Sequence, residues 1–290
     1  MSTQKFATKA LHAGHDVSKN GGTRAVPIYQ STAYVFDDSD DAAGRFNLSV
    51  PGFIYTRLNN PTNDILEQRI AALEGGIAAV ATASGTAAIS TTLLTLLKAG
   101  DHIVASSSLY GGTYNLLSVT LPRHGITTTF VDPSNPENFG KATQENTRAI
   151  FVESLGNPKL DVLDLEAISK EAKTHKVPLI VDNTVATPYL LNPIEYGANI
   201  VIHSLTKYIN GNGTSLGGII VDAGTFDWTN GKFPEFTEPS AGYHGLVYSE
   251  AIGPAAFIAK VRIEGLRDYG GALSPFNAFQ IIQGLETLEL

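Results

Sequence analysis

The chain has 290 residues, 43% of them hydrophobic and 17% charged, which suits a folded globular protein and is too little charge for a disordered polyelectrolyte. A net charge of −8 and the lack of any Lys/Arg run exclude the electrostatic footprint of a nucleic-acid or anionic-membrane binder, so we expect a small-molecule partner. Having no cysteine, the chain cannot use disulfides, a thiolate nucleophile or Cys-based metal sites.

No segment resembles a targeting or membrane-spanning sequence. The N-terminus MSTQKFATKALHAGHD lacks a long apolar core, and no later stretch reaches the ~20 apolar residues that span a bilayer. We therefore expect a cytoplasmic protein with no membrane partner.

The first part of the chain differs from the rest in its pattern. Residues 1–57 are rich in Gly, Asp, Ser, Thr and Pro and show neither helical nor strand periodicity, which favours an extended arm. A compact domain is expected over 58–290. Its first helix should run from near Asn60 to Gly75, with apolar residues at helical spacing at Ile65, Leu66, Ile70 and Leu73.

The domain continues as short apolar runs that alternate with amphipathic stretches such as residues 160–176. Each run has the length of a buried strand: AAVAT (78–82), HIVAS (102–106), TTTFV (127–131), AIFVE (149–153), PLIVD (178–182), NIVIH (199–203) and GGIIV (217–221). This alternation predicts an α/β fold, a three-layer sandwich whose mostly parallel sheet has helices on both faces. A final helix is expected to begin at Ser274-Pro275, and its uncapped end indicates a truncated chain.

Open α/β sheets bind ligands beyond the carboxyl ends of their strands, so polar residues that directly follow the apolar runs are the candidates for a binding site. The run NIVIH leads into Ser204-Leu205-Thr206-Lys207, which places an amine beside two hydroxyls. A lysine amine can form an imine with an aldehyde and act as a nucleophile and base, so Lys207 is the candidate catalytic residue. On position alone, a surface lysine is the commoner case.

Asp182 ends the apolar run PLIVD, where a carboxylate is costly unless it meets a cation. A protonated pyridine nitrogen is such a cation, and the pairing would make the ring an electron sink. An aspartate that caps a turn at Asp182-Asn183-Thr184 is an equally good interpretation of this residue by itself.

Ser84-Gly85-Thr86 lies between a predicted strand and a predicted helix. The backbone N–H groups of Gly85 and Thr86 would open a helix N-terminus that binds phosphate, with hydroxyls of Ser84, Ser204 and Thr206 as further donors. An ordinary capped helix is the alternative. Together, a phosphate cradle, an acidic ring partner and a lysine at three strand ends indicate pyridoxal 5'-phosphate (PLP).

These residues lie in stretches that resemble the Cys/Met-metabolism PLP-dependent enzymes of fold type I. The matching stretches are YTRLNNPT (55–62), ASGTAAI (83–89), SSLYGGTYNL (107–116), ESLGNP (153–158), VDNTVATPYL (181–190) and HSLTKYINGNG (203–213). The resemblance covers nearly the whole chain. It implies that a smaller C-terminal domain, with an arginine that grips the substrate carboxylate, is missing from this chain.

The resemblance also implies roles for residues that the pattern alone leaves open. Tyr55 and Arg57 would reach the cofactor phosphate of a neighbouring subunit, which implies a homo-oligomer, a dimer of dimers, with shared sites. Tyr110 would stack on the pyridine ring and act as acid or base at the γ-leaving group, Asn157 would contact the ring oxygen or the substrate carboxylate, and Thr184 would lie near the ring. A packed loop tyrosine and a simple Asn-Pro turn remain the alternatives for Tyr110 and Asn157.

Residues 242–288 resemble the O-acetylhomoserine sulfhydrylase branch of the family. This implies replacement of acetate by sulfide on O-acetyl-L-homoserine, giving homocysteine. Methionine γ-lyase or cystathionine γ-synthase activity, or a non-catalytic PLP-binding fragment, are the alternatives. His12 and His15 are interpreted as a loop pair, and no metal is expected.

Overall fold

The computed structural model describes residues 4–290. Its helices are α1 (Phe6–His12), α2 (Ser39–Phe46), α3 (Pro61–Glu74), α4 (Gly85–Leu96), α5 (Gly111–Asn115), α6 (Glu137–Ala142), α7 (Leu165–Thr174), α8 (Thr187–Leu190), α9 (Pro234–Thr237), α10 (Tyr248–Ala251), α11 (Ala256–Lys260), α12 (Arg267–Tyr269) and α13 (Pro275–Leu285). The strands are β1 (Ala78–Thr82), β2 (His102–Ser106), β3 (Thr127–Val131), β4 (Thr147–Glu153), β5 (Leu179–Asp182), β6 (Ile200–His203) and β7 (Gly218–Asp222). Short 3₁₀ and π-helical turns join several of these elements.

Within the described residues, the seven strands form one sheet in the order β1-β7-β6-β5-β4-β2-β3. Only β7 runs antiparallel, pairing in that sense with both β1 and β6. Each predicted apolar run is a strand, and the mostly parallel sheet is confirmed. Since β1, β2, β4, β5 and β6 point the same way, their carboxyl ends share one edge of the sheet.

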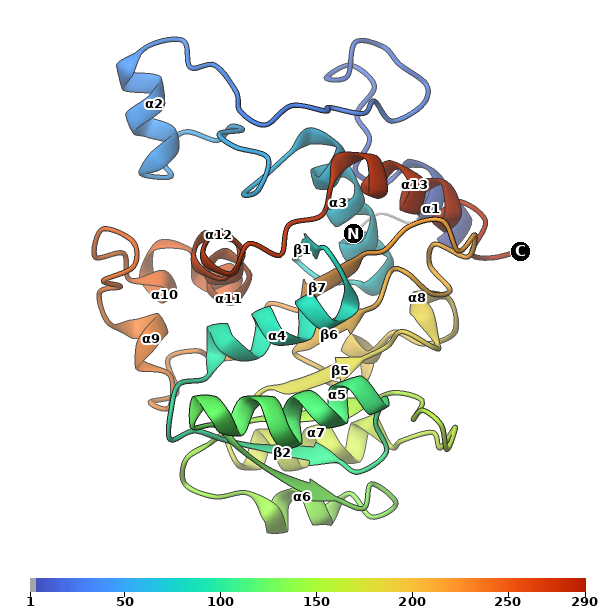
Figure 1. The fold of residues 1–290 in the computed structure, drawn as a ribbon, viewed down its shortest axis with the longest axis vertical. Helices are drawn as coiled ribbons and strands as arrows, with labels where there is room; N and C mark the ends of the chain where they lie inside the picture. Colours follow the sequence, from blue (N-terminus) through green and yellow to red (C-terminus); the bar gives the residue numbers. More distant parts are fainter. Residues whose placement is uncertain (1–3) are drawn as a thin grey trace.

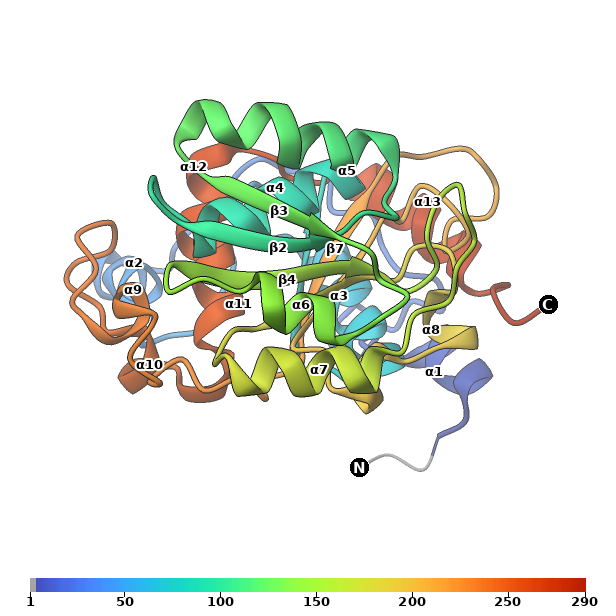
Figure 2. The ribbon, with the colours of Figure 1, turned by 90° about the horizontal axis from the view of Figure 1, so that it is seen from below.

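Helices cover both faces of this sheet, which makes three layers (Figure 2). On one face α3, α7 and α13 bury apolar side chains that include Ile70, Ile168 and Ile281. On the other, α4 and α11 contribute Leu93 and Phe257 to a second buried cluster. The strands between them are apolar on both sides, as expected for strands covered twice.

The helix ends explain why the sequence places these elements where it does. The helix α3 begins with Pro61 after an Asn60 cap whose side chain accepts from the Thr62 N–H, and it ends at Gly75 in the left-handed conformation. Ser274 caps α13 in the same way, by accepting from the Asn277 N–H. Both predicted helix starts are confirmed.

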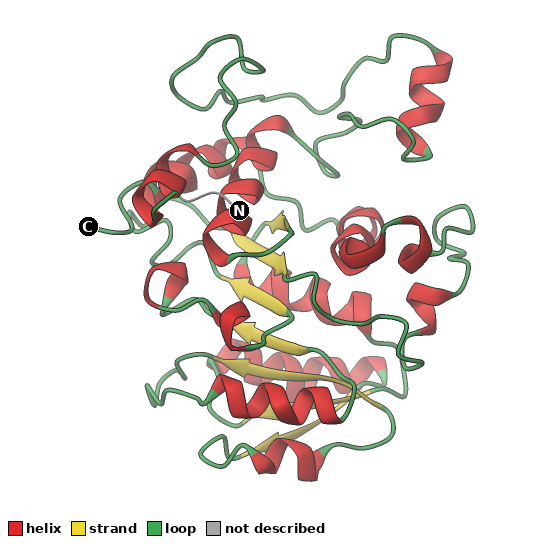
Figure 3. Ribbon diagram, turned by 180° about the vertical axis from the view of Figure 1, so that it is seen from behind, coloured by secondary structure: helices red, strands yellow, loops and turns green. Residues whose placement is uncertain are grey.

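The first segment contains more helix than the sequence indicated. Of the expected arm, the structure describes residues 4–57, which include α1 and α2 (Figure 1). The helix α1 lies against the domain, with Lys9 Nζ donating to the Ala72 carbonyl and the Phe6 ring 5.1 Å from that of Tyr189. Asp38 caps α2 through the Asp41 N–H. Residues 13–38 and 47–60 form long loops without helix or strand apart from the isolated bridge of Ala33 with Tyr55 (Figure 3).

Candidate functional site

A pocket of about 660 Å³ lies at the carboxyl edge of the sheet. Its walls come from the segments that follow β1, β2, β4, β5 and β6. Ten of the twelve residues expected to contact a cofactor line it: Ser84, Gly85, Thr86, Tyr110, Asn157, Asp182, Thr184, Ser204, Thr206 and Lys207. Residues that are separated by more than a hundred positions in sequence therefore share one cavity.

The N-terminus of α4 forms one side of the pocket. Ser84 caps the helix by accepting from the Ala87 N–H at 3.0 Å, which leaves the N–H groups of Gly85 and Thr86 at the helix end. A Cβ on Gly85 would lie 2.6 Å from Ser204 Cβ, so only glycine lets the helix end come this close to the end of β6. The capped-helix alternative and the phosphate cradle are thus compatible.

Asp182 joins β5 to the end of β6 through a chain of hydrogen bonds. Its Oδ1 accepts from the Thr184 N–H at 3.0 Å and from Thr184 Oγ1 at 2.5 Å, while Thr184 Oγ1 accepts from the Ser204 N–H at 2.8 Å. Burial raises the pKa of Asp182, and the bonds from Thr184 oppose that rise. The turn interpretation of Asp182 is therefore correct. It is compatible with the ring-partner interpretation, because the turn holds the carboxylate in place through Oδ1 and leaves Oδ2 available to a cationic ring nitrogen.

Lys207 and its neighbours form the turn that follows β6. The Lys207 N–H donates to the Ser204 carbonyl at 3.2 Å, and its side chain is exposed to the pocket. The Thr206 hydroxyl donates to the Gly217 carbonyl and accepts from the Gly217 N–H, both at 3.1 Å. The only O–H of Thr206 is thus used in a hydrogen bond, whereas the Ser204 hydroxyl donates no hydrogen bond within residues 4–290.

Tyr110 stands at the pocket entrance, on the loop between β2 and α5, with 53% of its surface exposed. Its ring lies over Gly112, where a Cβ would meet Tyr110 Cε1 at 2.5 Å. Its N–H donates to Glu153 Oε1 at 2.7 Å.

Glu153 is a pocket residue that the sequence reasoning missed, although it ends the run AIFVE just as Asp182 ends PLIVD. Its side chain is 5% exposed. Burial, followed by the nearby Asp182 carboxylate, raises the pKa of Glu153 to about 8. Asn157, on the loop beyond, is exposed to solvent and donates its backbone N–H toward Glu153.

A buried network on α3 supports the strand ends. His203 Nε2 lies 2.5 Å from Glu74 Oε1, with both side chains fully buried. Asn183 Nδ2 donates to the same Glu74 oxygen at 3.3 Å, and Ser154 Oγ donates to Asn183 Oδ1 at 2.7 Å. Since these residues adjoin Asp182, Ser204 and Glu153 in the chain, the network fixes the strand ends from which the pocket is built.

Tyr55 and Arg57 do not line the pocket. The Arg57 guanidinium lies 5.5 Å from the centre of the Tyr55 ring and donates to the Arg267 carbonyl, and Tyr55 is 42% exposed. Their role at a neighbouring subunit's cofactor stays a prediction.

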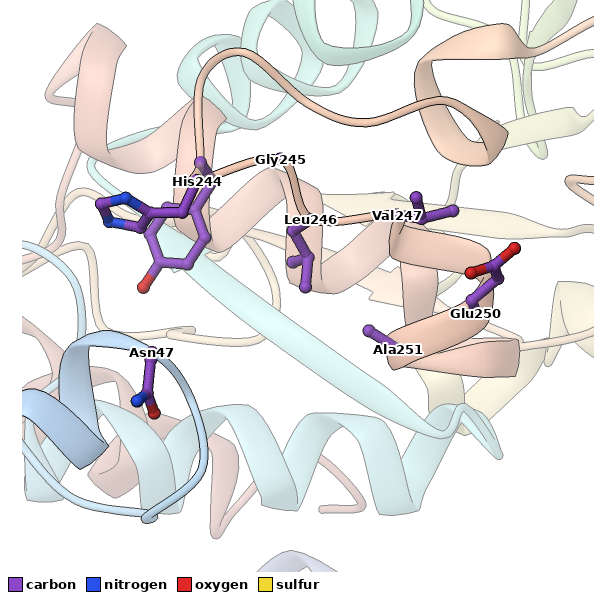
Figure 4. Close-up of a pocket in the computed structure, with 8 residues that line it drawn as sticks. Asn47, His244, Gly245, Leu246, Val247, Glu250 and Ala251 are labelled. Atoms are coloured by element: carbon purple, nitrogen blue, oxygen red, sulfur yellow. The ribbon is translucent and has the colours of Figure 1, made fainter.

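A second hollow, of about 580 Å³, lies between the loop after α2 and residues 243–251 (Figure 4). Asn47 faces His244 and Leu246 across it, and Glu250 stands at its other end. Its lining residues include no lysine, unlike those of the pocket at the sheet edge, and the helix that begins there, α10, has only four residues. Among residues 4–290, no cluster of three or more His, Asp or Glu side chains could hold a metal, and no helix is long and apolar enough to cross a membrane.

The residues of the sheet-edge pocket fit PLP. The α4 N-terminus offers N–H donors to a phosphate, Asp182 offers a carboxylate oxygen to a ring nitrogen, and Lys207 offers an amine to an aldehyde. The fold and the pocket define a cofactor-dependent α/β enzyme domain of the fold-type I class.

Comparison with known proteins agrees. Residues 7–290 match the family model of the Cys/Met metabolism PLP-dependent enzymes. An O-acetyl-L-homoserine sulfhydrylase of Leptospira meyeri is 58% identical over 99% of this chain and 66% of its own length, and a homocysteine synthase of Schizosaccharomyces pombe is 52% identical over 100% and 68%. The chain therefore belongs to the Cys/Met metabolism PLP-dependent enzyme family, as the resemblance predicted, and it spans about two thirds of the length of these relatives.

Solved structures agree with the fold. A crystal structure from Campylobacter jejuni, described as an O-acetylhomoserine (thiol)-lyase with a pyridoxyl-lysine monophosphate, superposes with a TM-score of 0.95 at 42% identity, covering 99% of this chain and 71% of that one. The metB structure from Corynebacterium glutamicum gives a TM-score of 0.80 at 34% identity, covering 99% and 64%. Fold type I is thereby confirmed.

Proposed function

We propose that the protein binds PLP in the sheet-edge pocket and replaces the acetate of O-acetyl-L-homoserine by sulfide, giving homocysteine and acetate. The observation that carries this proposal is the convergence of Ser84-Gly85-Thr86, Asp182 and Lys207 on one cavity. The names of the relatives support the choice of substrate over the methionine γ-lyase and cystathionine γ-synthase alternatives.

Each side chain has a task that follows from its position. Gly85 and Thr86 would bind the phosphate through N–H groups, with Ser84 and Ser204 adding hydroxyls. Asp182 would keep the ring nitrogen protonated through Oδ2. When bound, the cofactor supplies an electron sink for negative charge that develops on the substrate's carbons.

Lys207 and Tyr110 would carry out the proton transfers. Lys207 Nζ would hold the cofactor aldehyde and take the α-proton from the substrate. Tyr110 would stack on the ring and serve as acid or base at the leaving group, while Asn157 would contact the ring oxygen or the substrate carboxylate. In the net reaction the Cγ–O bond to acetate breaks and a Cγ–S bond forms from hydrogen sulfide, so no oxidant or reductant is needed.

We further propose a homo-oligomer, a dimer of dimers, located in the cytoplasm, with residues 1–57 as an arm that contacts a neighbouring subunit and residues 58–290 as the PLP-binding domain. Exposed apolar side chains along the arm support this, among them Val35 at 91% and Phe46 at 50% exposure. Light scattering after size exclusion measures the assembly directly.

The test of the function begins with an absorption spectrum of the purified protein after addition of PLP. We expect a long-wavelength band from the lysine-bound cofactor that is lost in Lys207→Ala. The control, Lys141→Ala, removes an exposed lysine paired with Glu137 and should keep the band.

Product analysis then decides between the activities. O-acetyl-L-homoserine with sulfide should yield homocysteine and acetate, and Lys207→Ala should reduce this by several orders of magnitude. Release of 2-oxobutanoate and ammonia instead would favour a γ-lyase, and cystathionine formation from cysteine a γ-synthase. A wild-type band without any turnover would favour the non-catalytic alternative.

A further inference from the structure

Two carboxyl groups lie side by side in the pocket. Glu153 is the last residue of β4 and Asp182 the last residue of β5, and the two are register partners in the parallel pair. Adjacent strands are roughly 4.8 Å apart, and residues in register send their side chains to the same face. Both line the pocket. Two neighbouring carboxylates in a protein interior disfavour each other's ionised form, and the Asp182 carboxylate is one cause that raises the pKa of Glu153, which favours a proton on one of the two near neutral pH.

The surroundings decide which of the two carries that proton. Asp182 accepts two hydrogen bonds from Thr184, and the electrostatic interaction with His203 also lowers its pKa. All three interactions favour the ionised form of Asp182. Glu153 also receives backbone N–H bonds, but it faces the Asp161 carboxylate in addition to Asp182. The cation of a bound cofactor ring would tilt the balance further, since it would lie at Asp182.

Glu153 also links two loops. Its Oε1 accepts the Tyr110 N–H at 2.7 Å, and the Asn157 backbone N–H is directed at the same carboxyl. Tyr110 and Asn157 are both expected to contact the cofactor. The Glu153 carboxyl thus connects the loop that follows β2 to the loop that follows β4 through hydrogen bonds.

We propose that Glu153 works as a neutral carboxylic acid, a positioning residue that holds the Tyr110 and Asn157 loops while Asp182 remains the single anion of this pair. The inference rests on the proposed function in one respect, namely that PLP occupies this pocket. The groups that bear on the proton are Asp182 on β5, Asp161 on the loop after β4, and the backbone N–H groups of Tyr110 and Asn157. Lys207 is a further titratable group that lines the pocket.

The first test needs no cofactor. In the cofactor-free protein, the infrared C=O band of protonated carboxylic acids should lose intensity at pH 7 in Glu153→Gln, whereas Glu166→Gln, which removes an exposed glutamate paired with Lys170, should leave it unchanged. Because the pKa of Glu153 lies above its unfolded value, wild type should lose stability as the pH rises from about 5 to 9. Glu153→Gln cannot ionise at this position and should lose less stability over the same pH range. The melting temperature of the variant should therefore rise relative to that of wild type as the pH increases.

The second test asks whether the carboxyl positions the loops. Glutamine keeps a carbonyl acceptor and no charge, so Glu153→Gln should hold PLP within about threefold of wild type at pH 7. Glu153→Ala removes the acceptor of two N–H groups and should weaken PLP binding by about tenfold or more.

Loss of PLP binding in Glu153→Gln, or an unchanged infrared band and pH dependence, would overturn the proposal. A wild-type protein that binds no PLP would instead refute the proposed function, and the infrared result would still decide the protonation of Glu153.

Discussion

Asp182 has surroundings that act on its pKa in opposite directions. Burial raises the pKa, and the two hydrogen bonds from Thr184 lower it, with burial the larger effect. An acid whose folded pKa exceeds its unfolded value contributes stability at low pH and loses it as the pH rises through the folded pKa. The ionised carboxylate therefore destabilises the cofactor-free fold at neutral and alkaline pH, as expected for a residue whose proposed role is to bind a cation.

This cost predicts opposite effects of Asp182→Asn on stability and on binding. The amide keeps an oxygen for the Thr184 donors and removes the charge, so the cofactor-free variant should melt higher than wild type at pH 8. Its PLP affinity should fall by roughly 30-fold or more, since removing one partner of a buried charge pair costs about 2–5 kcal/mol. Thermal melts and PLP titrations check both. A variant that gains stability yet retains its PLP affinity would show that Asp182 is not the ring partner.

At the scale of elements, the contact between α4 and β6 depends on one missing methyl group. A Cβ on Gly85 would lie 2.6 Å from Ser204 Cβ and 2.9 Å from its Cα, distances that force the helix end away from the strand. Gly85→Ala should destabilise the protein by about 1–3 kcal/mol and weaken phosphate binding at the displaced N–H groups. Gly111→Ala is the matched control, because its Cβ would meet nothing within 4 Å. Chemical denaturation and competition between PLP and inorganic phosphate measure the two effects, and equal behaviour of the two variants would count against the cradle.

The elements also show what could be predicted from the sequence. Continuous apolar runs of strand length locate all seven strands, and caps such as Asn60 and Ser274 locate helix starts, because these signals are local. The antiparallel direction of β7 has no such local signal, because the sequence of a strand that is buried on both faces is apolar throughout whichever way the strand runs. The helices α1 and α2 are short, and α1 depends on tertiary contacts such as that of Lys9 with Ala72. Glu153 was detectable by the rule that found Asp182, whereas its register with Asp182 required the sheet.

At the scale of the whole molecule, the assembly decides which pocket Arg57 can reach, the one in its own subunit or the one in a neighbouring subunit. Within its own chain, Arg57 lies by Tyr55 and the Arg267 carbonyl and not in the pocket. A guanidinium is a strong, forked donor to phosphate, and a twofold-related copy could present it to the neighbouring pocket. Arg57→Ala alone should weaken PLP retention, but that result does not reveal from which subunit the arginine acts.

Co-expression of Arg57→Ala with Lys207→Ala separates the two arrangements. If Arg57 acts across the interface, a mixed dimer contains one pocket in which Lys207 comes from the Arg57→Ala chain and Arg57 from the Lys207→Ala chain. That pocket is intact, so the mixture should show a stronger cofactor band and more turnover than either variant alone. If Arg57 acts within its own chain, every pocket in the mixture lacks one of the two residues, and mixing should restore nothing. Co-expression of Lys141→Ala with Lys207→Ala, in which the Lys141→Ala chain keeps both residues, shows the level of recovery that mixed assemblies can reach.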